Sequence, residues 1–350
     1  MPSIVTKSIA ALGLAAFALP VWAQFGPGTP TTSISNGVLE VGVSSSYGGA
    51  ITWLSLAGAN RNLINNHDKG RQIQQSYYAG LETDRLAEGQ RPNWSPWPWN
   101  PVQAGDSYNN PSLMLDETTD GEEIYIRVQP LLWDMNNELA EAHFESWIRL
   151  EGNIVKVRNR LTCFRTDDFW DVVPRHQELP AVITIGALST LYTYDGDSPF
   201  TRAPLTIIPP VTGGGFPWSY WGAGEKWAAH VDENLWGIGV YYADTEEFIG
   251  GFFGTPPGET ADNPTGYISP LRTIALDKDT VFEYEFDLIV GTLNEIRAHA
   301  YASEGHTYEL DPDNTEFPPS PSGVPVAGGA GLGLLVAMLS FRLFRGQARR

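Results

Sequence analysis

The sequence predicts an all-β fold, a large antiparallel β-sandwich with long loops and few short helices. Apolar and polar residues alternate in several runs, of which 123–128 (EIYIRV) is typical. The runs 142–150 and 154–164 are joined by a Glu-Gly-Asn turn, which is the pattern of a β-hairpin. Only 293–303 has the pattern of a helix, and no internal repeat is present.

Polar residues occupy one side of several of these predicted strands. Lys156, Arg158 and Arg160 share one face of the run that follows the hairpin turn, and acidic residues alternate in the same way along 281–290. A period of two with one polar face is typical of antiparallel sheets that are exposed on one side. We therefore expect two such sheets packed face to face.

The first 23 residues have the anatomy of a secretory signal peptide. Lys7 precedes an apolar run over 9–20, and the small residues Val21 and Ala23 stand just before an expected cleavage at Gln24. We expect the mature protein to be extracytoplasmic, in or outside a bacterial cell envelope, with a β-sandwich domain over 24–310.

The C-terminal region has the composition of a linker followed by a membrane segment. Residues 311–323 are rich in Pro and Ser, and the apolar part of 324–350 is about long enough to span a bilayer before four terminal arginines. The order resembles the sorting signals of the PEP-CTERM type, in which a membrane transpeptidase removes the tail. Here GVPV at 323–326 stands where Val-Pro-Glu-Pro is usual, so removal of the tail and a retained transmembrane anchor are both open.

Charge and composition limit the classes of molecule that the protein is expected to bind. The net charge is −19, and the body without its two basic, acid-free ends carries −24. Nucleic acid and anionic membrane surfaces attract positive proteins, so neither is expected as a partner of the body. The histidines show no metal-binding spacing, and we expect neither a metal nor another cofactor. Cys163, in an alternating run, is expected to be a buried thiol.

Two long loops are rich in tryptophan. The segment 91–101 reads RPNWSPWPWNP and includes Trp97 and Trp99, and 213–221 reads GGGFPWSYW and includes Trp218 and Trp221. Prolines stiffen such loops, and indole rings stack well on the C–H faces of sugar rings. We expect these four tryptophans to bind carbohydrate in an open groove; the alternative is that they fold inward and close the end of the sandwich.

Polar residues around the first loop complete this hypothesis. Arg71 and Gln74 lie in a polar segment that reads as a strand, and Asn100 and Gln103 follow the tryptophans. Together they are candidates for hydrogen bonds to sugar hydroxyls. The alternative is a polar network that fixes the long loop.

Arg175, His176 and Glu178 form the candidate catalytic cluster. His176 and Glu178 are two residues apart, so in an extended chain they point to the same side. An imidazole and a carboxyl on one face can supply an acid and a base, with Arg175 as a substrate-binding residue. A glycoside hydrolase needs two carboxylates, and the sequence does not identify the second.

The body resembles the galactose-mutarotase-like β-sandwiches. The motifs that carry the resemblance are GGAITWL at 48–54, NRNLI at 60–64 and HVDENLWGIGV at 230–240. The resemblance implies a supersandwich fold. In that superfamily a His and a Glu act as acid and base on a sugar, and the cluster at 175–178 is an analogue of that pair without a residue-by-residue match.

These observations lead to two hypotheses of different classes. The first is an exported carbohydrate-active protein that binds a glycan and cleaves or epimerises it, as a glycoside hydrolase, a polysaccharide lyase or an epimerase-like enzyme. The second is a non-catalytic surface or extracellular-matrix protein whose aromatic loops are structural.

Overall fold

A computed structural model describes residues 28–80, 85–92, 97–166, 172–212, 216–245 and 247–308. The predicted signal peptide (1–23), linker (311–323) and membrane segment (324–350) lie outside these ranges. Within the described ranges, no helix has the length and hydropathy of a membrane span.

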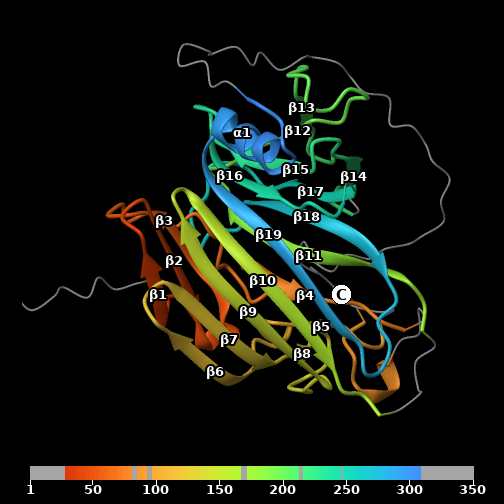
Figure 1. Cartoon of the computed structure of the whole chain (residues 1–350). Coiled ribbons are helices and arrows are strands. Elements are labelled where there is room, and N and C mark those ends of the chain that lie inside the picture. Colours follow the sequence, from red (N-terminus) through yellow and green to blue (C-terminus); the bar gives the residue numbers. More distant parts are fainter. Residues whose placement is uncertain are drawn as a thin grey trace, which may run out of the picture.

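The described strands form three antiparallel sheets, which confirms the predicted all-β sandwich (Figure 1). The largest has nine strands in the order β13-β12-β15-β16-β19-β10-β9-β7-β6. Its strands are β6 (Leu113–Thr119), β7 (Glu123–Gln129), β9 (Ala142–Glu151), β10 (Ile154–Cys163), β12 (Thr190–Thr193), β13 (Thr206–Ile208), β15 (Trp227–Val231), β16 (Trp236–Tyr241) and β19 (Val281–Thr292).

The second large sheet has seven strands in the order β14-β17-β18-β11-β4-β5-β8. A smaller sheet of three strands, β1-β2-β3, completes the fold. The strands of these two sheets are β1 (Thr32–Ser35), β2 (Leu39–Ser44), β3 (Ala50–Leu56), β4 (Gln74–Ser76), β5 (Pro101–Val102), β8 (Leu131–Leu132), β11 (Arg175–Ile185), β14 (Ser219–Gly222), β17 (Glu247–Phe253) and β18 (Thr265–Ile274).

The predicted hairpin is β9–β10, in which Glu151 faces Ile154 across the turn. Its residues alternate as the sequence indicates: Phe144 and Ile148 are buried, while Glu145 and Trp147 lie on the partly exposed face. Burial of large apolar side chains on the inner faces of the sheets builds the main core, and each contributes about 1.5–3 kcal/mol.

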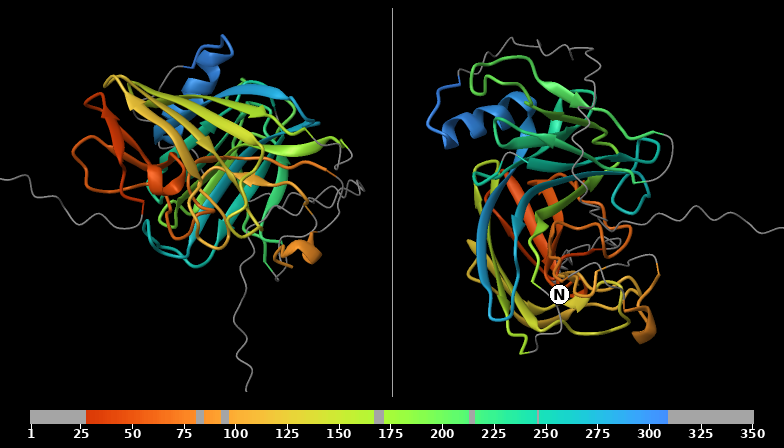
Figure 2. Two further views of the ribbon diagram at one scale, coloured as in Figure 1. Left: turned by 90° about the horizontal axis from the view of Figure 1, so that it is seen from below. Right: turned by 90° about the vertical axis from the view of Figure 1, so that its right-hand side faces the viewer.

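The predicted helix is α1 (Leu293–Ser303), which lies outside the sheets in Figure 2. A capping box between Thr292 and Glu295 begins it. Ile296 and Ala300 pack against apolar residues of β15, β16 and β19. The fully buried Arg297 donates two hydrogen bonds of 2.8 Å to Glu225, which also accepts bonds from neighbouring groups.

The described residues around the first tryptophan-rich loop, 85–92 and 97–110, contain more regular structure than a loop was expected to have. They include the short 3₁₀ helix η2 (Leu86–Glu88) and strand β5. A second 3₁₀ helix, η1 (Ser45–Tyr47), precedes β3.

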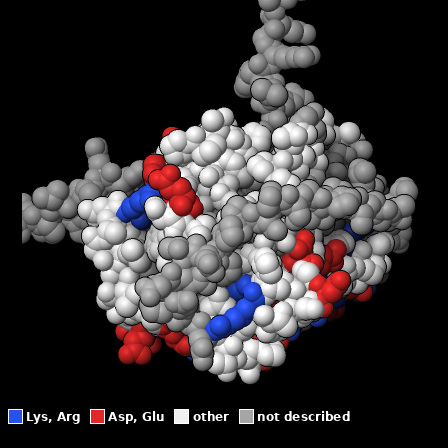
Figure 3. Space-filling view, turned by 90° about the horizontal axis from the view of Figure 1, so that it is seen from above, with Lys and Arg blue, Asp and Glu red and all other residues white. Residues whose placement is uncertain are grey.

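On the face shown in Figure 3, the described Lys and Arg side chains form small separate groups, with acidic groups and uncharged surface between them. Cys163 is buried, as expected.

Strand β11 contains a bulge that matters for the site. Glu178 pairs with Leu271 and Val182 with Ile268, so four residues of β11 span three of β18. The same extra residue separates the pairs that Glu178 and Ala181 make with β4. Because successive side chains alternate between faces, one extra residue places Glu178 and Ala181 on the same face of the sheet.

Candidate functional site

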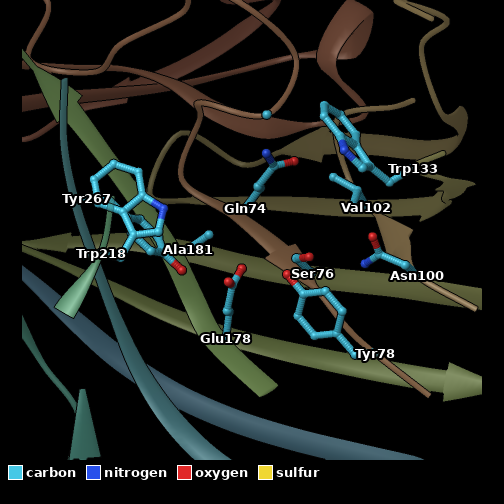
Figure 4. Close-up of a pocket in the computed structure, with 11 residues that line it drawn as sticks. Gln74, Ser76, Tyr78, Asn100, Val102, Trp133, Glu178, Ala181, Trp218 and Tyr267 are labelled. Carbon is cyan, nitrogen blue, oxygen red and sulfur yellow. The ribbon is translucent and has the colours of Figure 1, made fainter. Parts of the chain in front are cut away.

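A small cavity lies on the outer face of the seven-stranded sheet, the face turned away from the nine-stranded sheet (Figure 4). Its volume of about 30 Å³ accommodates two or three water-sized groups and not a whole sugar ring. The residues that line it are Gly70, Gln74, Ser76, Tyr78, Asn100, Val102, Trp133, Glu178, Ala181, Trp218 and Tyr267.

The alternation of β4 determines which of its residues reach this cavity. Gln75 donates a hydrogen bond of 3.0 Å to Ser146 of the nine-stranded sheet, and the Tyr77 ring packs edge-on against Phe144 at 5.1 Å. These two side chains point inward, so their neighbours Gln74, Ser76 and Tyr78 point outward into the cavity (Figure 4).

Glu178 is the acidic residue among those that line the cavity, and it is 6% exposed. Burial raises the pKa of its carboxyl to about 7, while the nearby hydroxyls of Tyr267 and Tyr78 act in the opposite direction. Burial and the Glu178 charge raise the pKa of both tyrosines well above the usual value, so the tyrosines keep their protons at neutral pH. A carboxyl whose pKa is raised in this way is suited to general acid–base chemistry near neutral pH.

Two donors at the cavity lack hydrogen-bond partners. The Tyr267 hydroxyl lies close enough to act on Glu178 but makes no hydrogen bond of good geometry, and the Trp218 indole N–H is also unsatisfied. Both residues are at least 97% buried, and their rings pack together at 5.0 Å. Buried donors normally have a partner, so the cavity is suited to an acceptor oxygen supplied by a ligand or by water.

Beside the cavity, the same face carries a partly exposed cluster. His176, two residues before Glu178 on β11, packs its ring against that of Tyr220 at 6.1 Å. Its Nδ1 lies 3.8 Å from a carboxylate oxygen of Glu247. Burial and the charges of Glu178 and Glu247 raise the pKa of Tyr220. Tyr220 therefore contacts His176 and is close enough to both carboxyls to be affected by their charges.

The structure brings together a part of the set predicted from sequence. Gln74, Asn100, Trp218 and Glu178 all line the cavity, and His176 lies on the same face, as the two-residue spacing predicts. The amides of Gln74 and Asn100 are already bonded to backbone groups, to Lys69 and Tyr77 among others.

Other predicted residues lie behind the cavity wall or away from it. The Trp97 ring packs against Tyr78 at 5.7 Å, and the Arg175 guanidinium lies over Trp97 and donates to the Gly80 carbonyl. Arg71 is fully buried and bonded to Asp68 and Asn263. Gln103 bonds to the backbone of Gln75 and Gly48, Trp99 belongs to the main core beside Arg165, and Trp221 stacks on Phe248 in the same core.

The open groove of tryptophans is not what these residues form. Trp97 is 0% exposed, Trp99 1%, Trp218 3% and Trp221 9%. Large aromatic side chains gain most from burial, and here the loops fold back onto the sheet so that their rings enter the cores. Of the four, Trp218 alone lines the cavity, and it does so as part of the wall.

Several residues of the site were not predicted: Ser76, Tyr78, Trp133, Tyr220, Glu247 and Tyr267. Ser76 and Tyr78 follow Gln74 at two-residue intervals in a segment that reads as a strand, and this spacing is the signal that could have found both. The others come from strands or loops far away in the sequence, and only the sheet order brings them together.

Comparison with known proteins finds solved structures whose folds are similar to that of this chain. No protein-family model matches the chain, and no curated protein does. Among solved structures, the chain is similar to a galactose mutarotase related enzyme from Lactobacillus acidophilus, with 12% identity over 74% of this chain and 96% of the other, at a TM-score of 0.45. A galactose mutarotase-like protein from Lactobacillus casei has 12% identity, coverage of 74% and 99%, and a TM-score of 0.43. A 4-alpha-glucanotransferase from Thermococcus litoralis has 14% identity, coverage of 75% and 37%, and a TM-score of 0.39.

Proposed function

We propose that this chain is an exported, carbohydrate-active protein that binds part of a sugar at the Glu178 cavity and uses Glu178 as a general acid–base group. The observation that carries the proposal is a buried carboxyl with a pKa of about 7 in a small polar cavity. Around it stand hydroxyl, amide and indole donors, which are the groups that bind sugar oxygens.

Because its pKa is raised to about 7, the Glu178 carboxyl is suited both to accept a proton from a sugar hydroxyl and to protonate a sugar oxygen. His176 lies on the same face, where its ring packs against Tyr220, and it is the second candidate for proton transfer. Hydrolysis of a glycosidic bond requires a second carboxylate, and Glu247, beside His176, is the candidate among the described residues of this cluster.

The reaction classes are not equally supported. A polysaccharide lyase removes a proton next to a carboxylate of its substrate, and a positive charge beside that carboxylate favours the step. Neither Lys nor Arg is among the described residues that line the cavity. Hydrolysis and epimerase-like proton transfer therefore fit the site better than elimination.

Export belongs to the same proposal. It is supported by the signal-peptide anatomy of 1–23 and by the apolar segment 324–350 with its arginines, which would anchor the body to the membrane or serve a sorting transpeptidase. Immunodetection of the body in cell fractions, with 324–350 deleted as the comparison, tests the location.

The experiment that tests the activity is a screen of aldoses and polysaccharides with the wild type and the Glu178→Gln variant. We expect the variant to lose turnover and keep sugar binding, because Gln retains the shape and the polar contacts but cannot transfer a proton. Unchanged turnover in the variant would remove Glu178 from the mechanism.

A second function has one observation in its favour. The cavity is only about 30 Å³, and the four predicted tryptophans are buried, which agrees with a non-catalytic surface or extracellular-matrix protein. Absence of both binding and turnover across the sugar screen would favour this alternative.

A further inference from the structure

We infer that the ligand is a neutral oligosaccharide that occupies two adjoining subsites. One sugar unit lies in an open depression at the edge strand β14, and one polar substituent of the oligosaccharide enters the Glu178 cavity. This inference rests on the proposed function and extends it by naming the class of ligand.

The depression, here called the β14-edge groove, lies on the surface beside the edge of the seven-stranded sheet. It is lined by Tyr220, Trp221, Gly222, Thr245 and Glu247, and its volume is about 470 Å³. The groove is shallow and wide open to solvent, so a sugar unit can lie against it, whereas the cavity is too small for one.

Two chain segments connect the groove with the cavity. On β11, Glu178 lines the cavity, while His176, two residues earlier, contacts Tyr220 and Glu247 at the groove. At the start of β14, Trp218 lines the cavity, and Tyr220, two residues later, lines the groove. Residues two apart in extended chain are about 7 Å apart, which is close to the length of one sugar unit.

Tyr220 is the aromatic contact that this arrangement offers to a sugar ring. The residue is 45% exposed, in contrast to the four buried tryptophans. An exposed aromatic ring beside a carboxylate supplies both a stacking surface and a hydrogen-bond acceptor for hydroxyls. The cavity supplies the complementary donors, because the Tyr267 hydroxyl and the Trp218 N–H lack partners.

The charge of the two subsites selects a neutral ligand. The cavity contains Glu178 and the groove contains Glu247, and none of the described residues lining either of them is Lys or Arg. Arg175, on the same strand as His176, donates to the Gly80 carbonyl beside Trp97. A uronic acid would therefore meet carboxylates without a compensating cation.

Calorimetric titration of the full chain tests this inference. The probes are neutral gluco- and galacto-oligosaccharides of one to six units, and oligogalacturonides of the same lengths. We expect affinity for the neutral series to rise with the second or third unit, and the oligogalacturonides to bind at least about tenfold more weakly. Tyr220→Ala should remove the gain with length, a loss of about two- to tenfold.

Two further variants make the test specific. Tyr125→Ala is the matched control, because Tyr125 is a partly exposed tyrosine on the outer face of the other large sheet, and it should behave as the wild type. Glu247→Lys should raise the affinity for oligogalacturonides, and it keeps the charge argument testable if Tyr220→Ala does not fold.

The outcomes separate the inference from the proposed function. Binding of neutral sugars without dependence on length, or with Tyr220→Ala equal to the wild type, would overturn the inference and leave the proposed function in place. A preference for oligogalacturonides would also overturn the inference. Absence of binding to any of the probes would overturn both.

Discussion

The raised pKa of Glu178 has a consequence for stability that does not depend on any ligand. Burial raises the pKa of Glu178 in the folded protein to about 7, whereas the usual pKa of an exposed Glu is 4.5. Between these values the folded state binds a proton that the unfolded state releases, so this group lowers the free energy of unfolding as the pH rises. The separation corresponds to about 3 kcal/mol, fully developed above about pH 7.

The pH dependence of the free energy of unfolding of the wild type alone would not reveal this effect, because His230 changes that free energy in the opposite direction. His230 is fully buried between the sheets, and burial lowers its pKa to about 4. Between pH 4 and 6.5, the usual pKa of an exposed His, the unfolded state binds the extra proton, so this group makes the protein more stable as the pH rises. The two contributions are similar in size and nearly cancel over part of the range.

The Glu178→Gln variant separates them. Gln has the shape of a protonated Glu and does not titrate, and His230 is the same in both proteins. Urea unfolding followed by tryptophan fluorescence at a series of pH values gives the free energy of unfolding of each. We expect the variant to gain about 3 kcal/mol relative to the wild type between about pH 4.5 and pH 8. Parallel curves for the two proteins would refute the reasoning, since Glu178 would then titrate as an exposed carboxyl.

Two further predictions use the same urea titration. Glu225→Gln should lower the free energy of unfolding by about 3–5 kcal/mol, because it leaves the buried Arg297 without its charge partner. Glu259→Gln, at an exposed ion pair, should cost less than about 1 kcal/mol, and equal losses in the two variants would contradict the prediction. Trp97→Ala should cost about 3–5 kcal/mol because its ring is fully buried. A Trp97→Ala variant with wild-type stability and without sugar binding would instead restore the stacking role.

The fold could be predicted from the sequence because its strands are exposed on one side. In β9 and β10 the alternation of apolar and polar residues is continuous, and the turn between them is short and polar. The helix α1 was also evident, since its start is encoded locally by Thr292 and Glu295. The order of strands within each sheet was not accessible, because pairs such as β4–β11 join residues about a hundred positions apart.

The site could be predicted only where local spacing decides it. The shared face of His176 and Glu178, and that of Gln74 and Ser76, follow from alternation along a single strand. Tyr267 could not be assigned, because it reaches the cavity through the pairing of β18 with β11. The tryptophans were misjudged because a proline-rich loop gives no periodicity, so the sequence does not show whether the loop folds over the sheet or extends away from it.

The bulge in β11 makes the number of residues between Glu178 and Val182 as important as their identity. Deletion of one residue from this stretch would turn every following side chain of the strand to the opposite side. Ala181 and Ile183, which pack on the cavity side, would then exchange places with Val182 and Thr184, so the packing on both faces of the strand would be lost. A change in the length of this stretch is therefore expected to disturb the cavity more than most single substitutions would. We expect related sequences that keep the cavity to keep the length of this stretch as well.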